Sequence, residues 1–218
     1  MESTVTMNKI LRDRLKSLAL AAAFALAGVA ATPAAEQTLM LYGDSLMAGL
    51  GLSEQDGFAG RLQAELGDEV TIVNASVSGD TSADGLARLD WSLGERPDAV
   101  VLELGANDML QGLDVAAMRR NLTAMLERFT AENIPVLLVG MRASPSLGSD
   151  YVQEYEAVFP ELATQFDTAF YPFFLDGVVT DATLNQADGM HPNAAGVSRI
   201  VQSILPSVSA LLKSAAGR

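Results

Sequence analysis

Short, almost wholly apolar runs recur along the chain and alternate with longer segments of helical spacing. The runs predict strands at Thr38–Tyr42, Val70–Val73, Ala99–Leu104 and Ile134–Val139, with a weaker strand near Thr168–Tyr171. Because nearly every position in these runs is apolar, we expect both faces of the sheet to be buried. A strand followed by a helix, repeated five times, predicts a parallel α/β sheet that is covered by helices on both faces.

Apolar residues spaced three and four positions apart mark the helices between the strands. They predict helices near residues 58–66, 81–93, 115–129, 151–166 and 197–212. Asp114 is the expected N-cap of the third helix. Pro160 predicts an interruption or offset in the fourth helix, and Pro206 predicts a kink or break in the last one. In sheets of this kind, sites form at the carboxyl ends of the strands, and the polar motifs of this sequence lie there.

The first 35 residues follow a different pattern. Four basic side chains lie between Lys9 and Lys16, an apolar run of 14 residues extends from Leu18 to Ala31, and small residues continue to Ala35. This order is typical of a secretory signal peptide, and the apolar run is short for a bilayer span. We predict a signal peptide over residues 1–35, cleaved between about residues 31 and 35, one domain over residues 36–218, and a periplasmic or secreted protein. An uncleaved membrane anchor is the alternative.

Charge and composition restrict the kinds of partner and site. The chain has 27 acidic and 14 basic side chains, a net charge of −13, and residues 36–218 carry about −15. Such a charge disfavours nucleic acid and anionic membranes as main partners, although solubility alone also accounts for it. The absence of cysteine excludes disulfides and thiolate catalysis. The single histidine excludes a metal site with several histidines.

A serine follows the first predicted strand directly, in the motif Tyr42-Gly43-Asp44-Ser45-Leu46. This position places Ser45 on a tight turn with its hydroxyl exposed. A serine hydroxyl is a weak nucleophile and needs a neighbouring base to take its proton. A turn that merely caps the following helix has the same residues, so the motif alone leaves both interpretations open.

The only histidine lies in Asp188-Gly189-Met190-His191-Pro192, just before the last predicted helix. Asp188 is placed to accept the Nδ1 proton of His191, which leaves Nε2 available as a base. Pro192 suits the start of a helix. The alternative is a simple helix entry with Asn193 or Asp188 as the cap.

Two further loops offer hydrogen-bond donors for the oxyanion of a tetrahedral intermediate. Gly79 follows the second strand, where glycine allows its backbone N–H to approach a ligand closely. Asn107 lies in Gly105–Asp108 after the third strand and offers a side-chain amide. The backbone N–H of Ser45 completes the set. Each loop is ordinary by itself, since Asp80 or Thr81 also suits the cap of the next helix.

Serine, glycine, asparagine and histidine thus follow successive elements of one sheet, and on these residues the sequence resembles the SGNH (GDSL) hydrolase superfamily. Residues 73–82, 85–89 and 103–108 look like the bacterial periplasmic acyl-CoA thioesterase I/lysophospholipase/arylesterase group. The resemblance covers residues 38–212. It implies a three-layer α/β/α sandwich of flavodoxin-like type with five parallel strands, and neither cofactor nor metal. It also implies a nucleophile at Ser45, a base at His191 oriented by Asp188, and oxyanion donors at Ser45, Gly79 and Asn107.

The resemblance implies a serine esterase that hydrolyses carboxylic esters and thioesters through an acyl-enzyme. Aryl esters, short- to medium-chain acyl esters, acyl-CoA and lysophospholipids are the expected substrates. Met109 and Leu110 either line an apolar acyl pocket or belong to the core. The loop at residues 142–150 is less typical of this group, so the sequence does not determine which acyl chain length the pocket prefers.

Two other functions are compatible with the fold. A carbohydrate acetyl esterase is one, although only 6% of the residues are aromatic, which provides little surface for sugar stacking. A non-catalytic periplasmic binding protein is the other. It would lack at least one of four residues, and none of these is missing: Ser45, Asn107, Asp188 and His191. The expected partner is a small-molecule substrate, without nucleic acid or an obligate protein partner, and the expected state is a monomer or weak homo-oligomer.

Overall fold

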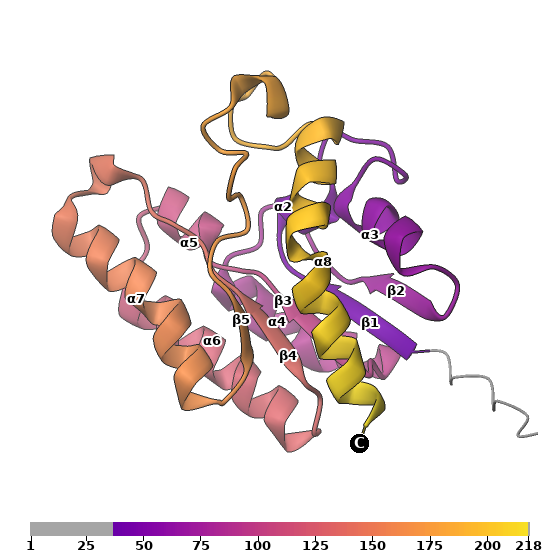
Figure 1. Cartoon of the computed structure of the whole chain (residues 1–218). Coiled ribbons are helices and arrows are strands. Elements are labelled where there is room, and N and C mark those ends of the chain that lie inside the picture. Colours follow the sequence, from indigo (N-terminus) through magenta and orange to yellow (C-terminus); the bar gives the residue numbers. More distant parts are fainter. Residues whose placement is uncertain (1–36, 218) are drawn as a thin grey trace, which may run out of the picture. The chain divides into compact units, whose positions relative to one another are not determined.

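The computed structural model describes residues 37–217, and the chain builds one five-stranded sheet in this range (Figure 1). All neighbouring strands are parallel, in the order β2-β1-β3-β4-β5. The strands are β1 (Gln37–Tyr42), β2 (Val70–Asn74), β3 (Ala99–Leu102), β4 (Val136–Val139) and β5 (Ala169–Tyr171). The predicted parallel sheet is therefore confirmed. The third apolar run extends past β3 because Leu104 is still buried after strand pairing stops, and the fourth begins at Ile134, a partly buried residue two positions before β4.

Seven helices accompany the sheet in the described part of the chain. They are α2 (Ser45–Ala48), α3 (Phe58–Leu66), α4 (Ser82–Ser92), α5 (Ala106–Leu110), α6 (Val115–Ala131), α7 (Ser149–Gln165) and α8 (Ala194–Ala216). Three 3-10 turns lie between them: η1 (Leu93–Glu95), η2 (Pro145–Leu147) and η3 (Ala182–Leu184). The short helices α2 and α5 were not expected from the spacing, since four or five residues are too few to show a period.

The helices form one layer on each side of the sheet. Helices α3 and α8 pack together on one face, whereas α4, α6 and α7 follow one another across the other face (Figure 1). The strands between the layers are buried, and every residue from Leu39 to Tyr42 has no exposed surface. This arrangement is the expected three-layer α/β/α sandwich of flavodoxin-like order.

Both helices that contain a proline continue through it. Helix α7 runs from Ser149 to Gln165 with Pro160 inside, and α8 runs from Ala194 to Ala216 with Pro206 inside. The interruption predicted at Pro160 and the break predicted at Pro206 are therefore wrong. A proline inside a helix costs about 3 kcal/mol through a lost hydrogen bond and ring clash. Each helix buries an apolar face on the core, and this packing outweighs the local cost.

Side-chain caps begin the helices that lead away from the functional loops. Asp114 caps α6 by accepting from the backbone N–H groups of Ala116 and Ala117, as predicted. Thr81 caps α4. Asn193 caps α8. Because Asn193 fills this role, the carboxylate of Asp188 is not needed as the cap.

Helix α8 has the length and apolar composition of a membrane-spanning helix. Its apolar face nevertheless packs against β1, β3, β4 and β5, so in the described residues it is a helix of the core. The predicted signal peptide, residues 1–35, lies outside the part of the chain that the structure describes.

The strand order places the functional loops at one edge of the sheet. From β1 the chain adds β2 on one side, and it then adds β3, β4 and β5 on the other side of β1. The direction in which strands are added therefore reverses between β1 and β3. Ligands bind at such a switch point, beyond the carboxyl ends of the strands. Ser45 follows β1 and Asn107 follows β3, so both lie at this point.

Gly196, in the first turn of α8, lies directly against the loop that carries His191. A Cβ at this position would lie 2.1 Å from the carbonyl oxygen of Leu184 in η3. We predict that Gly196→Ala lowers the free energy of unfolding by about 1–3 kcal/mol, because backbone atoms must shift to admit the methyl group. Urea denaturation measures this change.

The matched control is Gly94→Ala. A Cβ at Gly94 would meet no atom within 4 Å. Its free energy of unfolding should stay within about 0.5 kcal/mol of the wild type. Equal stability of the two variants would contradict the close contact at Gly196.

Candidate active site

Ser45 is the first residue of α2, three residues after β1 ends. Asp44 caps this short helix, and its Oδ1 accepts from the backbone N–H of Leu46 at 3.0 Å. The hydroxyl of Ser45 lies 2.9 Å from Nε2 of His191, although 146 residues separate them in sequence. The structure therefore brings together the serine and the histidine that the sequence singled out.

Asp188 holds the other side of the histidine ring. Its Oδ2 lies 2.7 Å from Nδ1 of His191, while its Oδ1 accepts from the backbone N–H groups of His191 and Met190 at 3.0 and 2.9 Å. The bonds from the His191 and Met190 backbones are the main causes that lower the pKa of Asp188 to about 2. The ionised carboxylate accepts a hydrogen bond from the Nδ1–H of His191, and in that tautomer Nε2 is free to accept the proton of Ser45.

Two backbone N–H groups beside Ser45 have no hydrogen-bond acceptor among residues 37–217: those of Ser45 itself and of Gly79. Gly79 has a φ of +92°, in the region that favours glycine, and a Cβ there would meet nothing within 4 Å. The backbone conformation at this position therefore favours glycine. Gly79, Ser45 and Asn107 line the same cavity.

Asn107 is held more firmly than its motif indicates. Its Nδ2 lies 3.1 Å from Oδ2 of Asp44 and 3.0 Å from the carbonyl oxygen of Asp80. An amide nitrogen has two hydrogens, so both are donated within the protein. Asn107 therefore stabilises the Ser45 turn, and it can donate to a ligand only by exchanging one of these bonds.

A second carboxyl group lies buried behind Ser45. Glu103 has no exposed surface, and its oxygens have no hydrogen bond of normal geometry within the described residues. Burial is the main cause that raises the pKa of Glu103 well above its usual range, and neighbouring Asp44 raises it further. Burial also raises the pKa of Asp44 to about 6. The pair therefore retains a proton that two exposed carboxyl groups would lose.

Sequence reasoning did not single out Glu103. The available signal was one acidic residue near the end of an apolar run, Ala99–Leu104, where a charge is costly unless it has a specific role.

Arg88 joins the loop of Gly79 to the turn of Ser45. Its guanidinium donates to Asp80 at 2.5 Å, to the carbonyl oxygen of Ala75 at 2.5 Å and to that of Gly43 at 3.3 Å. The side chain is about four-fifths buried, so solvent screens this pair less than an exposed one. Arg88 thereby fixes the distance between two loops that follow different strands.

Asp108 performs a similar task for Asn107. Its carboxylate accepts from both the backbone N–H and the hydroxyl of Ser82, at 2.7 and 2.5 Å. These bonds fasten α5, which carries Asn107, to the start of α4. The sequence motif contained Asp108 but offered no sign of this partner, which lies 26 residues away.

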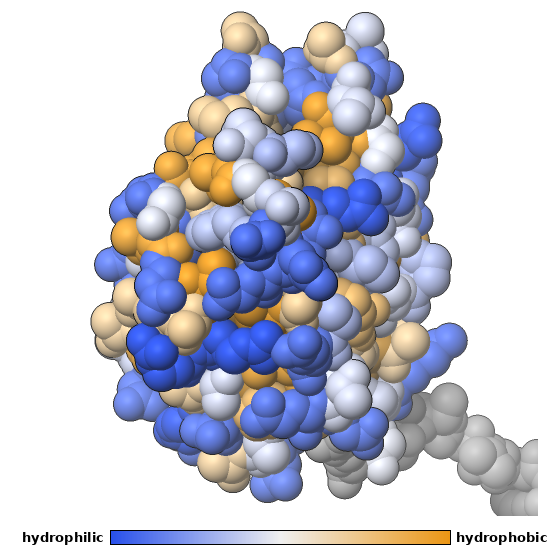
Figure 2. Space-filling model, turned by 90° about the vertical axis from the view of Figure 1, so that its left-hand side faces the viewer, coloured by the Kyte–Doolittle hydropathy of each residue, from blue (hydrophilic) through white to orange (hydrophobic). Residues whose placement is uncertain are grey.

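A cavity of about 760 Å³ opens beside Ser45. Met109 and Leu110 both line it, and Met109 also packs against the hydrophobic core. Its apolar lining comes from several loops: Leu46, Leu50, Ala106, Met109, Leu110, Met141, Ala143, Pro145, Val152, Phe173, Leu175, Val179 and Met190. Hydrophobic residues also gather in the upper half of the face shown in Figure 2, whereas hydrophilic residues predominate below.

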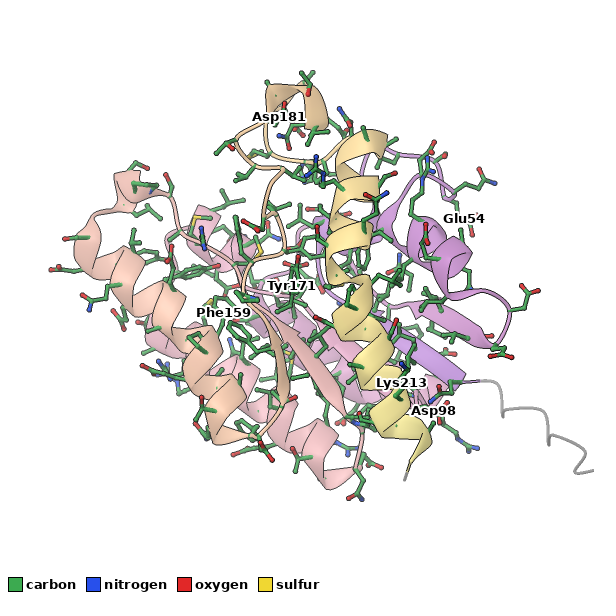
Figure 3. The ribbon with its side chains drawn as sticks, viewed as in Figure 1. Glu54, Asp98, Phe159, Tyr171, Asp181 and Lys213 are labelled. Carbon is green, nitrogen blue, oxygen red and sulfur yellow. The ribbon has the colours of Figure 1, made fainter. Side chains whose placement is uncertain are left out.

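The loop between β5 and α8 stands at the carboxyl edge of the sheet. Figure 3 shows Asp181 of this loop at one end of the molecule, with Lys213 and Asp98 at the opposite end. Asp98 accepts from the backbone N–H of Thr38 at the start of β1, which marks that end as the amino edge. His191 therefore reaches Ser45 from a loop above the carboxyl edge.

Comparison with known proteins agrees with this geometry. The GDSL-like lipase/acylhydrolase family matches residues 41–199. This chain belongs to that family. The resemblance to SGNH hydrolases and the expected fold are thereby confirmed.

Three relatives illustrate the family. Esterase TesA of Pseudomonas aeruginosa is 44% identical over 183 residues, 82% of this chain and 91% of that protein. Thioesterase 1/protease 1/lysophospholipase L1 of Escherichia coli K12 is 38% identical, over 73% of this chain and 77% of that protein. The crystal structure of the psychrotrophic esterase EstA from Pseudoalteromonas sp., inhibited by monoethylphosphonate, has a TM-score of 0.76 and 32% identity, over 81% of this chain and 99% of that one.

The buried carboxyl pair makes stability depend on pH. The folded chain keeps a proton on Glu103 and Asp44 that the unfolded chain releases above about pH 4. Because the folded state then binds more protons at this pair, the contribution of the pair to the free energy of unfolding falls as pH rises from about 4 to 7. We predict that Glu103→Gln, which cannot ionise, makes this fall smaller. Urea denaturation at several pH values measures the slope.

Glu65→Gln is the control for that slope, since Glu65 is exposed on α3. It should leave the pH dependence of unfolding unchanged. A Glu103→Gln slope equal to that of the wild type would show that the buried pair holds no extra proton.

Proposed function

We propose that this protein is a serine esterase that hydrolyses carboxylic esters and thioesters through a covalent acyl-enzyme. The observation that carries the proposal is the chain of contacts from Ser45 to His191 to Asp188, at 2.9 and 2.7 Å, beside an apolar cavity. Ser45 is the nucleophile, His191 the general base, and Asp188 the group that orients the base.

The reaction has two steps of the same kind. The hydroxyl oxygen of Ser45 attacks the substrate carbonyl while Nε2 of His191 takes its proton, and Asp188 stabilises the imidazolium that forms. The tetrahedral intermediate collapses, and His191 gives the proton to the leaving alcohol or thiol. Water then attacks the acyl-enzyme with the same proton transfers in reverse, which releases the acid and restores Ser45.

Three donors face the carbonyl oxygen in this proposal: the backbone N–H groups of Ser45 and Gly79, and the amide of Asn107. The first two have no acceptor among the described residues, so they cost no internal hydrogen bond when they bind an oxyanion. Asn107 exchanges one of its bonds, to Asp44 or Asp80, for a bond to the oxyanion. That exchange favours the transition state, in which the oxygen carries a full negative charge.

The cavity favours an acyl chain over a sugar. Its volume lies within the range of about 300–1,000 Å³ for small-molecule sites. Phe173 is the only aromatic residue among those that line it, and the guanidinium of Arg142 lies over its ring at 4.9 Å. No open aromatic surface remains in the lining for sugar stacking. Short- to medium-chain acyl esters, aryl esters and acyl thioesters suit this lining.

The relatives support the same class of substrate. Their names describe an esterase, a thioesterase with lysophospholipase activity and an arylesterase of Vibrio mimicus, the last 36% identical over 75% of this chain. Inhibition of the Pseudoalteromonas esterase by a phosphonate is consistent with an activated serine. We also propose that residues 1–35 direct export to the periplasm or exterior, and that the enzyme acts as a monomer or weak homo-oligomer on small molecules.

We predict that Ser45→Ala abolishes hydrolysis of p-nitrophenyl esters and acyl-CoA, because within residues 37–217 no other hydroxyl is hydrogen-bonded to His191. Circular dichroism and urea denaturation should show an intact fold. Assays of aryl esters, acyl-CoAs and lysophospholipids with both proteins identify the preferred substrate. Wild-type turnover by the variant would disprove the role of Ser45.

Asn107→Ala should lower kcat by about 10²-fold, the usual effect of losing one oxyanion donor. The KM should change much less, since the bond forms with the developing charge. Steady-state kinetics on a p-nitrophenyl ester separate the two constants. An effect on KM alone would show that Asn107 contacts the bound substrate without stabilising the oxyanion.

A further inference from the structure

The serine and the histidine of the proposed site lie on two loops that few contacts connect. In the described part of the chain, only two hydrogen bonds join residues 43–57 to residues 176–193. One is the bond between Ser45 and His191. The other runs from Nε2 of Gln186 to the carbonyl oxygen of Leu50, at 2.8 Å.

Gln186 also forms hydrogen bonds to the backbone of His191 and of the next residue, Pro192. Its Nε2 lies 3.0 Å from the carbonyl oxygen of Pro192, and its backbone N–H donates to the carbonyl oxygen of His191 at 2.8 Å. Both hydrogens of the amide are therefore used, one for each loop. One side chain thus bridges the residue after His191 and the segment after Ser45.

The bridge continues to the backbone of Ser45 through a single residue, Leu50. The N–H of Leu50 donates to the carbonyl oxygen of Ser45 at 3.1 Å, and the carbonyl oxygen of Leu50 accepts from Gln186. Two hydrogen bonds therefore connect the side chain of Gln186, through Leu50, to the backbone carbonyl of Ser45.

Gly51 lies directly beside this amide. A Cβ on Gly51 would lie 2.3 Å from Oε1 of Gln186. The φ of +79° at Gly51 also favours glycine there, so the turn leaves room for the amide of Gln186.

Neighbouring amides do not duplicate this bridge. Asn185 donates to the carbonyl oxygens of Val178 and Asp181, and Asn193 donates to those of Thr183 and Asn185. All of these bonds lie within the loop that carries His191. They make the loop rigid but do not set its position relative to Ser45.

We propose that Gln186 is a positioning residue that sets the distance between Ser45 Oγ and His191 Nε2. This inference rests on the proposed function, because it assigns a role within the same site. A general base must lie within hydrogen-bond reach of the group it deprotonates. A displacement of about 1 Å is enough to cost about 10²-fold in rate.

The test uses Gln186→Glu, which keeps the shape of the side chain but replaces the donor by a carboxylate that only accepts. It would face the carbonyl oxygens of Leu50 and Pro192, so the bridge is lost. We expect kcat for p-nitrophenyl butyrate to fall by about tenfold to 10²-fold with little change in KM. The rate of Ser45 labelling by a fluorophosphonate should fall in parallel, because labelling needs the same proton transfer.

Gln63 provides a matched control. Its Nε2 also joins two carbonyl oxygens, those of Gly67 and Val70 at 2.8 and 2.7 Å, but it fastens α3 to β2 rather than the two catalytic loops. Gln63→Glu should therefore lower stability while kcat per folded molecule stays at the wild-type value. Near-ultraviolet circular dichroism gives the folded fraction for every variant.

A second variant, Gln186→Ala, covers the case in which the new carboxylate prevents folding. It removes the bridge without adding a charge, and it should show the same loss of kcat per folded molecule. Wild-type kcat and labelling rate per folded molecule in Gln186→Ala would overturn the proposal. If Ser45→Ala is inactive at the same time, the proposed function stands and only the role of Gln186 fails. Activity in Ser45→Ala would instead reject the proposed function itself.

Discussion

The hydrogen bond between Ser45 and His191 joins a turn after the first strand to a loop before the last helix, and the rest of the fold sets its length. The parallel sheet brings both segments to its carboxyl edge, at the point where strand order reverses. Helix α8, capped by Asn193, then fixes where the loop of His191 ends. Asp188 bonds to the ring of His191 and the backbone N–H of Gln186 bonds to its carbonyl oxygen, so the proposed base is held without substrate.

The surroundings of this bond are unusually polar for the interior of a small domain. Asp44, Glu103 and Asp108 are buried within the carboxyl edge, and the guanidinium of Arg88 is largely buried beside them. Burying ionisable groups costs free energy unless they are paired or keep a proton. Here the cost is offset by bonds that hold four loops at set distances. Glu103 is the exception, because it has no normal hydrogen bond and retains its proton instead.

The apolar cavity beside this polar cluster divides the site into two parts with different tasks. In the proposed reaction the polar part aligns the reacting atoms, while the apolar part, built from α5 and the loops after β4 and β5, is the proposed place of the acyl group. Several of its residues, among them Leu110, Val179 and Met190, are exposed at its rim. Loops of this kind vary without disturbing the sheet, so the reaction and the choice of substrate are physically separable.

The sequence by itself determined the elements and the candidate site residues. Apolar spacing located all five strands and the long helices, because burial of a strand or a helix face leaves a local period. The positions of Ser45, Gly79 and Asn107 after strands and of His191 before the last helix were also visible in the motifs. Boundaries were less accurate where apolar residues continue past the end of β3 and precede the start of β4.

Only the tertiary structure decided which distant groups meet. It showed that α7 and α8 continue through Pro160 and Pro206, that Asn107 is bound to Asp44, and that Met109 and Leu110 face the cavity. It also revealed that Glu103 is buried close to Asp44, and that Gln186 bonds to the carbonyl oxygens of Leu50 and Pro192. These features depend on contacts between residues far apart in sequence, and such contacts leave no period or motif in the chain. A glutamine in a loop looks like any other until the carbonyl oxygen of Leu50, 136 residues away, is seen to accept its hydrogen.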